Sequence, residues 1–73
     1  MLTKREMEIA GLVAAAQSNR QISRRLNLSE HTVKNYLFKI YEKVGVASRV
    51  ELAVFMMNLQ QRDLGIASDR AAF

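Results

Sequence analysis

The helix expected at residues 30–44 has an outer face whose side chains could contact the edges of DNA bases. Asn35 could pair with adenine through two hydrogen bonds, Lys34 could bind guanine O6 and N7, and Phe38 could touch a thymine methyl group. His31 falls on the same face and, as a lone histidine, is a poor candidate for a metal ligand. Exposed Lys and Asn side chains are most often only hydrated, and Phe38 could instead meet a partner chain or simply be tolerated.

The positive charge of the chain is concentrated in its middle third. The net charge is +4, and residues 20–43 hold six basic residues against two acidic ones. The rest of the chain carries five of each sign and is neutral. Such a stripe is typical of a surface that binds nucleic acid or another anion, although a hydrated basic face would have the same composition. The basic residues are Arg20, Arg24, Arg25, Lys34, Lys39 and Lys43.

Length and composition exclude several classes of protein. The 73 residues allow one small domain, and the lack of cysteine removes disulfides and Cys-based zinc sites and fits a reducing cytoplasm. We expect neither secretion nor a membrane span, because no signal peptide is recognisable and the apolar runs are short. One histidine, no carboxylate cluster and no Gly-rich phosphate loop predict a protein that is not an enzyme and needs no cofactor or metal.

Helix-capping residues divide the chain into four helices. The pattern S/T-x-x-E/Q satisfies two backbone donors at a helix start and occurs three times, and Ser29 is a further N-cap candidate. No segment shows β alternation, so we expect an all-α, compact four-helix domain over residues 1–61 and a flexible tail over 62–73. The three capping boxes are Thr3–Glu6, Ser18–Gln21 and Ser48–Glu51.

The two middle helices have the spacing of a helix-turn-helix. The short second helix is expected to end at Asn27, which tolerates a left-handed conformation, and the third to end at Gly45. A connection of three or four residues between them predicts that the third helix, over about 30–44, lies in the major groove. Its core-facing side is expected to consist of Val33, Leu37, Ile40 and Val44.

Motifs that run in order from Leu2 to about Gln61 resemble the LuxR/GerE-type helix-turn-helix domain. Members of this family are bacterial transcription regulators, often the C-terminal output domain of response regulators or quorum-sensing receptors, and some are stand-alone proteins. The matches are Leu2–Glu6 to L-T-x-R-E, Ser18–Ile22 to S-N-K-E-I, Leu28–Leu37 to L-S-E-x-T-V-K-N-H-L, Lys43–Val46 to K-L-G-V, and Ser48–Ala53 to S-R-x-E-L-A.

The resemblance implies roles for individual residues in DNA binding. It implies base contacts from the positions of His31, Lys34, Asn35 and Phe38. We expect no small-molecule ligand in this domain, and RNA polymerase is a candidate partner. From its chemistry alone, Tyr36 could donate to a phosphate or pack at the edge of the core. The positions that the resemblance assigns to phosphate contacts are Asn19, Arg20, Thr32, Tyr36 and Lys39.

The chain departs from the family pattern at three positions. The family usually has Gly where Ala16 stands, so we expect the first helix to end without a left-handed residue or to run longer. Tyr36 replaces a common His, and Val44 replaces Leu. Because a lone domain of this size is close to the stability limit, we expect an excised output domain rather than a stand-alone regulator.

The fourth helix, expected at residues 48–61, has two apolar stripes where a small domain needs one. One consists of Val50, Ala53, Val54 and Met57. The resemblance implies a dimer through this helix, and we assign the second stripe to that interface; the alternative is that the tail covers Leu52 and Phe55. The residues of the second stripe are Leu52, Phe55, Met56 and Leu59.

These observations predict a sequence-specific, double-stranded DNA-binding transcription regulator, acting as a homodimer in the bacterial cytoplasm, at the nucleoid. One alternative is a sigma-factor region-four-like domain, against which the segment Ser48–Ala53 argues. The other is a helical protein-interaction module without DNA binding, which would have no need of a basic middle third. Steep weakening of binding with salt would distinguish a DNA-binding domain from this module.

Overall fold

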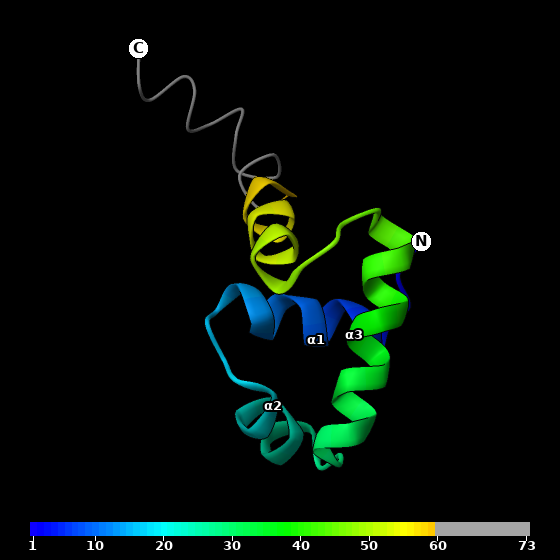
Figure 1. Cartoon of the computed structure of the whole chain (residues 1–73). Helices are drawn as coiled ribbons and strands as arrows, with labels where there is room; N and C mark the ends of the chain where they lie inside the picture. Colours follow the sequence, from blue (N-terminus) through cyan, green and yellow to red (C-terminus); the bar gives the residue numbers. More distant parts are fainter. Residues whose placement is uncertain (60–73) are drawn as a thin grey trace.

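The computed structural model describes residues 1–59 and contains four helices and no strand in that range (Figure 1). The prediction of a flexible tail at 62–73 lies outside the described residues. The helices are α1 (Lys4–Ala14), α2 (Asn19–Leu26), α3 (Glu30–Val44) and a helical segment at residues 49–59.

Side-chain caps start the helices where the sequence predicts them. Thr3 and Glu6 form a reciprocal capping box at α1, and Ser18 and Gln21 form another at α2. Ser29 caps α3 by accepting a hydrogen bond from the Thr32 backbone N–H at 3.0 Å. The helix at 49–59 has a variant of the box: Ser48 Oγ accepts from the Glu51 N–H at 3.2 Å, while Glu51 Oε1 accepts from the Ala47 N–H at 3.1 Å.

Left-handed residues end the first three helices. Asn27 (φ 57°) and Gly45 (φ 77°) take the conformation that the sequence predicts. The expectation for α1 is wrong, because Ala16 is itself left-handed, with a φ of 64°. Two hydrogen bonds of 3.0 Å close this turn, one from the Ala16 N–H to the Val13 carbonyl and one from the Gln17 N–H to the Leu12 carbonyl. They offset a conformational cost of roughly 1–2 kcal/mol for a residue with a Cβ.

All four helices contribute to one apolar core. In Figure 1, α1 lies between α2 and the helical segment 49–59, and α3 runs along one side of the molecule. α3 packs against both α1 and α2, so its inner face is covered along its length. The core residues are Ile9, Ala10, Val13, Ile22, Val33, Leu37, Ile40, Leu52 and Met56.

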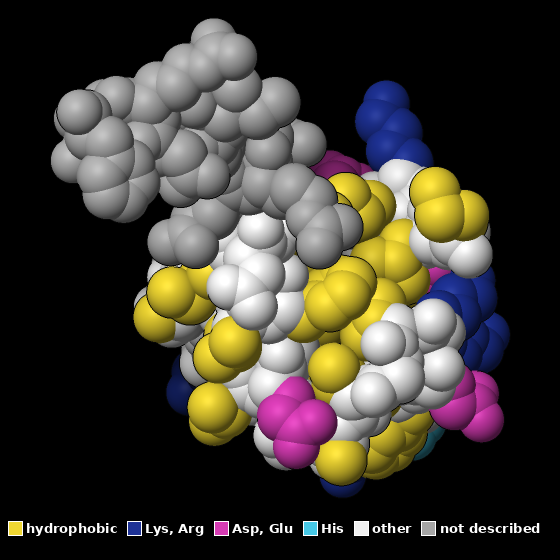
Figure 2. Space-filling view, turned by 90° about the horizontal axis from the view of Figure 1, so that it is seen from above, with side chains coloured by type: hydrophobic (Ala, Val, Ile, Leu, Met, Phe, Trp, Pro, Cys, Tyr) yellow, Lys and Arg dark blue, Asp and Glu magenta, His cyan; other side chains and the backbone are white. Residues whose placement is uncertain are grey.

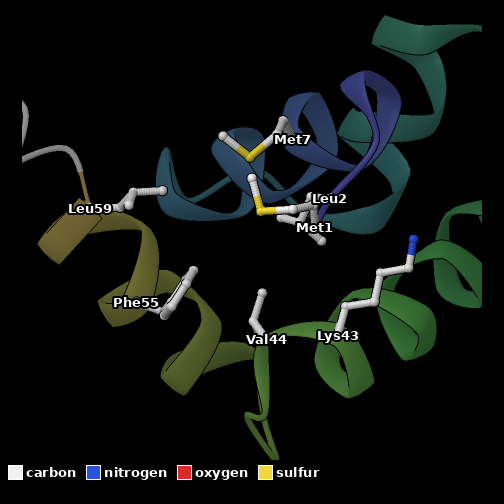
Figure 3. A pocket seen from close by; sticks show the side chains of 7 residues that line it. All are labelled: Met1, Leu2, Met7, Lys43, Val44, Phe55 and Leu59. Carbon is white, nitrogen blue, oxygen red and sulfur yellow. The ribbon is translucent and has the colours of Figure 1, made fainter.

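The second stripe of the fourth helix, which the sequence predicts to form a dimer interface, faces the core. Leu52 is 0% exposed and Met56 is 3% exposed, so the expectation that these two side chains meet a second chain is wrong. Phe55 and Leu59 are half-buried and line an apolar hollow together with Met7 of α1 (Figure 3). Periodicity identifies both stripes but cannot tell which one faces α1. The alternative in which the tail covers Leu52 and Phe55 lies outside the described residues.

Three of the four residues of the other stripe face outward, and the fourth, Ala53, packs against the core. Val50 is 73% exposed, Val54 is 49% exposed and Met57 is 50% exposed. Figure 2, which views the molecule from the side of this helix, shows hydrophobic side chains gathered on that face. The exposed stripe, Val50, Val54 and Met57, is therefore the apolar surface that the fourth helix offers to its surroundings.

Candidate DNA-binding interface

The outer face of α3 carries the predicted base-contacting side chains in the open. Val33, Leu37 and Ile40 anchor the opposite face in the core, and Val44 is half-buried. The 15 residues of α3 give a helix of about 22 Å at 1.5 Å per residue, which suits a major groove about 12 Å wide. All four predicted base-contacting residues are exposed: His31, Lys34, Asn35 and Phe38.

Phe38 is a large apolar side chain in this exposed face. It is 56% exposed, and its ring meets the ring of Tyr41 edge-on, with 6.5 Å between centroids and an angle of 70° between planes. Edge-to-face pairs of aromatic rings are attractive, so Tyr41 supports one side of the Phe38 ring. The remaining surface of the ring is available to a ligand, for instance a base methyl group.

The short turn between α2 and α3 holds the two helices close together. Only three residues, 27–29, separate the two helices, as the sequence predicts for a helix-turn-helix. The Leu28 N–H donates to the Ser23 carbonyl at 2.8 Å, and Leu26 and Leu28 pack against the core. The buried Ser23 hydroxyl in turn donates to the Arg20 carbonyl at 2.7 Å. These contacts leave the pair of helices little freedom to open.

The predicted phosphate-contacting residues divide into two groups by burial. Arg20 and Lys39 are exposed and can reach a phosphate as charged side chains. Asn19, Thr32 and Tyr36 are half-buried, so the structure already restricts where their polar groups lie.

The half-buried Thr32 and Tyr36 keep polar groups that can serve a phosphate. The Ser29 hydroxyl donates to Thr32 Oγ1 at 2.8 Å, so the proton of the Thr32 hydroxyl is left for another acceptor. The Tyr36 ring packs against the core, which agrees with one of its two predicted roles. Packing of the ring does not engage the hydroxyl at its tip, so the second role stays a prediction.

One residue of the basic stripe has a structural partner that the sequence does not reveal. Lys43 Nζ donates to Glu6 Oε1 at 2.8 Å, and the same oxygen accepts from the Thr3 N–H at 2.7 Å. The hydrogen bond from Lys43, followed by the one from Thr3, holds the pKa of the buried Glu6 carboxyl below its usual value of 4.5. Lys43 thus joins α3 to the start of α1, and five basic residues of the stripe remain for a ligand.

Arg49 is a second residue whose role the sequence conceals. It is the first residue of the helical segment 49–59 and is half-buried. Its Nη1 atom donates to Asn19 Oδ1 at 2.6 Å, and its Nη2 atom donates to the Gln17 carbonyl. Asn19 is one of the predicted phosphate-contacting residues, so Arg49 connects the fourth helix to the candidate interface. Its place in the S-R-x-E-L-A motif is the signal that could have singled it out.

Other kinds of site find no support in the part of the chain that the structure describes. Residues 1–59 contain no group of three or more His, Asp or Glu side chains that could hold a metal ion. Within the same range, no helix combines the length and apolar content that crossing a membrane would require.

Known proteins with similar sequences are bacterial regulators. The chain is 38% identical over 60 residues to the DNA-binding transcriptional activator DevR/DosR of Mycobacterium tuberculosis, a match over 82% of this chain and 28% of the relative. It is 41% identical over 54 residues to the response regulator GacA of Pseudomonas viridiflava, covering 74% of this chain and 25% of that protein. The HTH-type transcriptional regulator MalT of Vibrio campbellii is 37% identical over 60 residues, which are 82% of this chain and 7% of MalT.

The chain therefore spans less than a third of the length of each of these relatives. The model of the family described as bacterial regulatory proteins, luxR family, matches residues 1–56, which include all of α1, α2 and α3. The match covers the exposed face of α3, the short turn that precedes it and the start of the fourth helix. The chain belongs to the LuxR family of bacterial regulatory proteins, and it is a helix-turn-helix domain of the type found in DNA-binding transcription regulators.

Proposed function

We propose that the chain binds double-stranded DNA sequence-specifically by placing α3 in the major groove. The observation that carries this proposal is the exposed face of α3, where a Lys and an Asn are adjacent in the sequence, and whose opposite face is buried except at the half-buried Val44. Asn35 pairs with adenine, Lys34 binds guanine, and Phe38 contacts a thymine methyl group. His31, at the second position of the helix, lies near the base edges at the start of α3.

We further propose that residues around this face bind the DNA backbone and set the register of α3. Arg20 and Lys39 neutralise phosphates, and the Thr32 and Tyr36 hydroxyls donate hydrogen bonds to phosphate oxygens. Asn19 at the start of α2 donates from its amide group. Such contacts add affinity for any duplex and carry no sequence information of their own.

We also propose that the chain acts as a homodimer through the outer face of the fourth helix. The exposed stripe, Val50, Val54 and Met57, is apolar, and Val46 adds to a shallow groove beside it. A two-fold dimer through this stripe would present two copies of α3 to the half-sites of a palindrome. The site of action is then the nucleoid in the bacterial cytoplasm, with RNA polymerase as a further partner.

Selection from a pool of random duplexes tests the proposed function. The chain is mixed with the pool at low and moderate salt, and the retained DNA is sequenced. We expect enrichment of a two-fold symmetric site. The binding constant should fall by about 0.9 logarithmic units per neutralised phosphate for each tenfold rise in salt concentration. Absence of binding at both salt concentrations would contradict the proposal and favour a protein-interaction module.

Two alanine variants separate base reading from backbone binding. We expect Asn35→Ala to reduce the discrimination between the selected site and random DNA by about 1–3 kcal/mol, because a bidentate base contact is lost. Lys39→Ala should weaken binding to both duplexes equally and lower the salt slope by about one. Both side chains are exposed, so neither change should alter the fold. Unchanged discrimination in Asn35→Ala would show that the reading face is assigned wrongly.

A further inference from the structure

Arg49, at the start of the helical segment 49–59, contacts the turn between α1 and α2. Its guanidinium donates to Asn19 Oδ1 at 2.6 Å and to the Gln17 carbonyl, so one side chain bridges both sides of the Ser18 cap. The Gln17 backbone is itself fixed by its hydrogen bond to Leu12. The guanidinium therefore has a rigid support at Gln17 and a side-chain partner at Asn19.

This contact decides the orientation of the Asn19 amide. A guanidinium can only donate, so the amide must turn its oxygen toward Arg49. The amide NH₂ group is then directed away from the guanidinium. Within residues 1–59 no acceptor takes a hydrogen bond from that NH₂ group. The arrangement leaves two donors, at the first residue of α2, without a protein partner in this range.

We propose that Arg49 is a positioning residue for DNA binding: it holds Asn19 with its NH₂ group ready to donate to a backbone phosphate. The inference rests on the proposed function, because Asn19 meets a phosphate only if the chain binds DNA. Arg49 acts through Asn19: two of its five guanidinium N–H groups donate within the protein, one to Asn19 Oδ1 and one to the Gln17 carbonyl, and these two bonds fix its position.

The role also links two parts of the proposed complex. Arg49 is the first residue of the helix whose exposed stripe we assign to the dimer, and Asn19 is the first residue of α2. The position of the fourth helix therefore sets the position of a donor to the DNA backbone. A direct ion pair between Arg49 and a phosphate would not couple the fourth helix to the Asn19 donor, because Asn19 would take no part in it.

A double-mutant cycle on DNA binding tests the proposal. The parent chain, Asn19→Ala, Arg49→Gln and the double variant are titrated into the selected duplex, well below the melting temperature of each. We expect either single change to weaken binding about 3- to 10-fold, as for one lost hydrogen bond. The double variant should bind no more weakly than the weaker single variant. Losses that multiply would overturn the proposal.

The salt dependence distinguishes positioning of Asn19 by Arg49 from a direct contact between Arg49 and a phosphate. Asn19 is neutral, so its phosphate contact releases no counterion, and Arg49→Gln should leave the slope of log affinity against log salt unchanged. A slope lowered by about 0.9 would mean that Arg49 neutralises a phosphate itself and would overturn the proposal.

A further variant covers the case in which Arg49→Gln does not fold. Asn19→Asp keeps an acceptor for Arg49 and removes the NH₂ donor, so it should fold normally and bind DNA at least 10-fold more weakly. Binding equal to that of the parent would overturn the proposal. If the parent itself binds no duplex, the proposed function fails and this role fails with it; if the parent binds and the cycle is additive, only this role fails.

Discussion

Replacing Leu52 by Ala tests whether the inner stripe of the fourth helix belongs to the core. The Leu52 side chain has no exposed surface and belongs to the same cluster as Ile9 and Ile40. A buried Leu→Ala change costs about 2–5 kcal/mol, the sum of lost transfer free energy and a residual cavity. A chain of 73 residues has a free energy of unfolding of about 4–11 kcal/mol at 0.05–0.15 kcal/mol per residue. At the middle of both ranges, the variant loses about half of its stability.

The matched control is Val54, two residues further along the same helix. About half of this side chain is exposed and it lies outside the core cluster, so Val54→Ala should change the free energy of unfolding of the monomer by no more than about 0.5 kcal/mol. Val54→Asp should leave the monomer folded and weaken the proposed dimer, because it places a charge in an apolar interface.

Circular dichroism and sedimentation equilibrium distinguish the two outcomes. Each lost kcal/mol lowers the melting temperature of a domain of this size by roughly 4–8 °C, so Leu52→Ala should melt at least about 8 °C lower than the parent. Melting is followed at several protein concentrations, because association stabilises a dimer by mass action. A Leu52→Ala variant that melts like the parent but no longer associates would refute the placement of Leu52 in the core.

Three further changes test the turns and the ion pair between Lys43 and the buried Glu6. Ala16→Gly should raise the free energy of unfolding by about 0.5–1 kcal/mol. Glycine adopts a positive φ without the steric cost, and this gain is partly offset by the larger backbone entropy that glycine loses on folding. A lower melting temperature would contradict this. Ser18→Ala should lower it by about 0.5–2 kcal/mol through loss of the cap on α2, measured by urea titration, whereas an unchanged midpoint would mean that the box is dispensable. The Glu6 carboxylate, whose pKa is lowered in the fold, stabilises the protein above its unfolded pKa, and this contribution is lost as pH falls through the lowered value. Urea titrations of the parent from pH 6 to 3 should therefore show stability falling with pH more steeply than in Glu6→Gln, and parallel curves would argue against the Lys43–Glu6 pair.

The exposed face of α3 could be predicted from the sequence because its determinants are local. Side chains 100° apart on one helix fix which of them share a face, and Val33, Leu37 and Ile40 are apolar enough to say which face is inside. Caps at Ser18 and Ser29 act over three residues, so they too are visible in the sequence.

The remaining features depend on contacts between distant segments. Lys43 looks like part of a basic stripe until α3 is placed beside the start of α1, 37 residues away. Arg49 similarly meets Asn19 across 30 residues. On the fourth helix both stripes are apolar, so the pattern cannot say that Leu52 rather than Val54 faces α1. Ala16 shows a different limit: the hydrogen bonds of the turn override the reluctance of a residue with a Cβ to adopt a left-handed conformation.

The division between local caps and distant polar contacts has a kinetic consequence. Each cap forms within one helical turn and can help its helix to start before the tertiary fold exists. Helical domains dominated by such short-range contacts fold within about a millisecond or faster. Lys43–Glu6 and Arg49–Asn19 can form only once the helices have docked. Contacts that are still absent in the folding transition state slow unfolding more than they speed folding. We therefore expect loss of either long-range polar contact to speed unfolding more than it slows folding, and loss of a cap to slow folding.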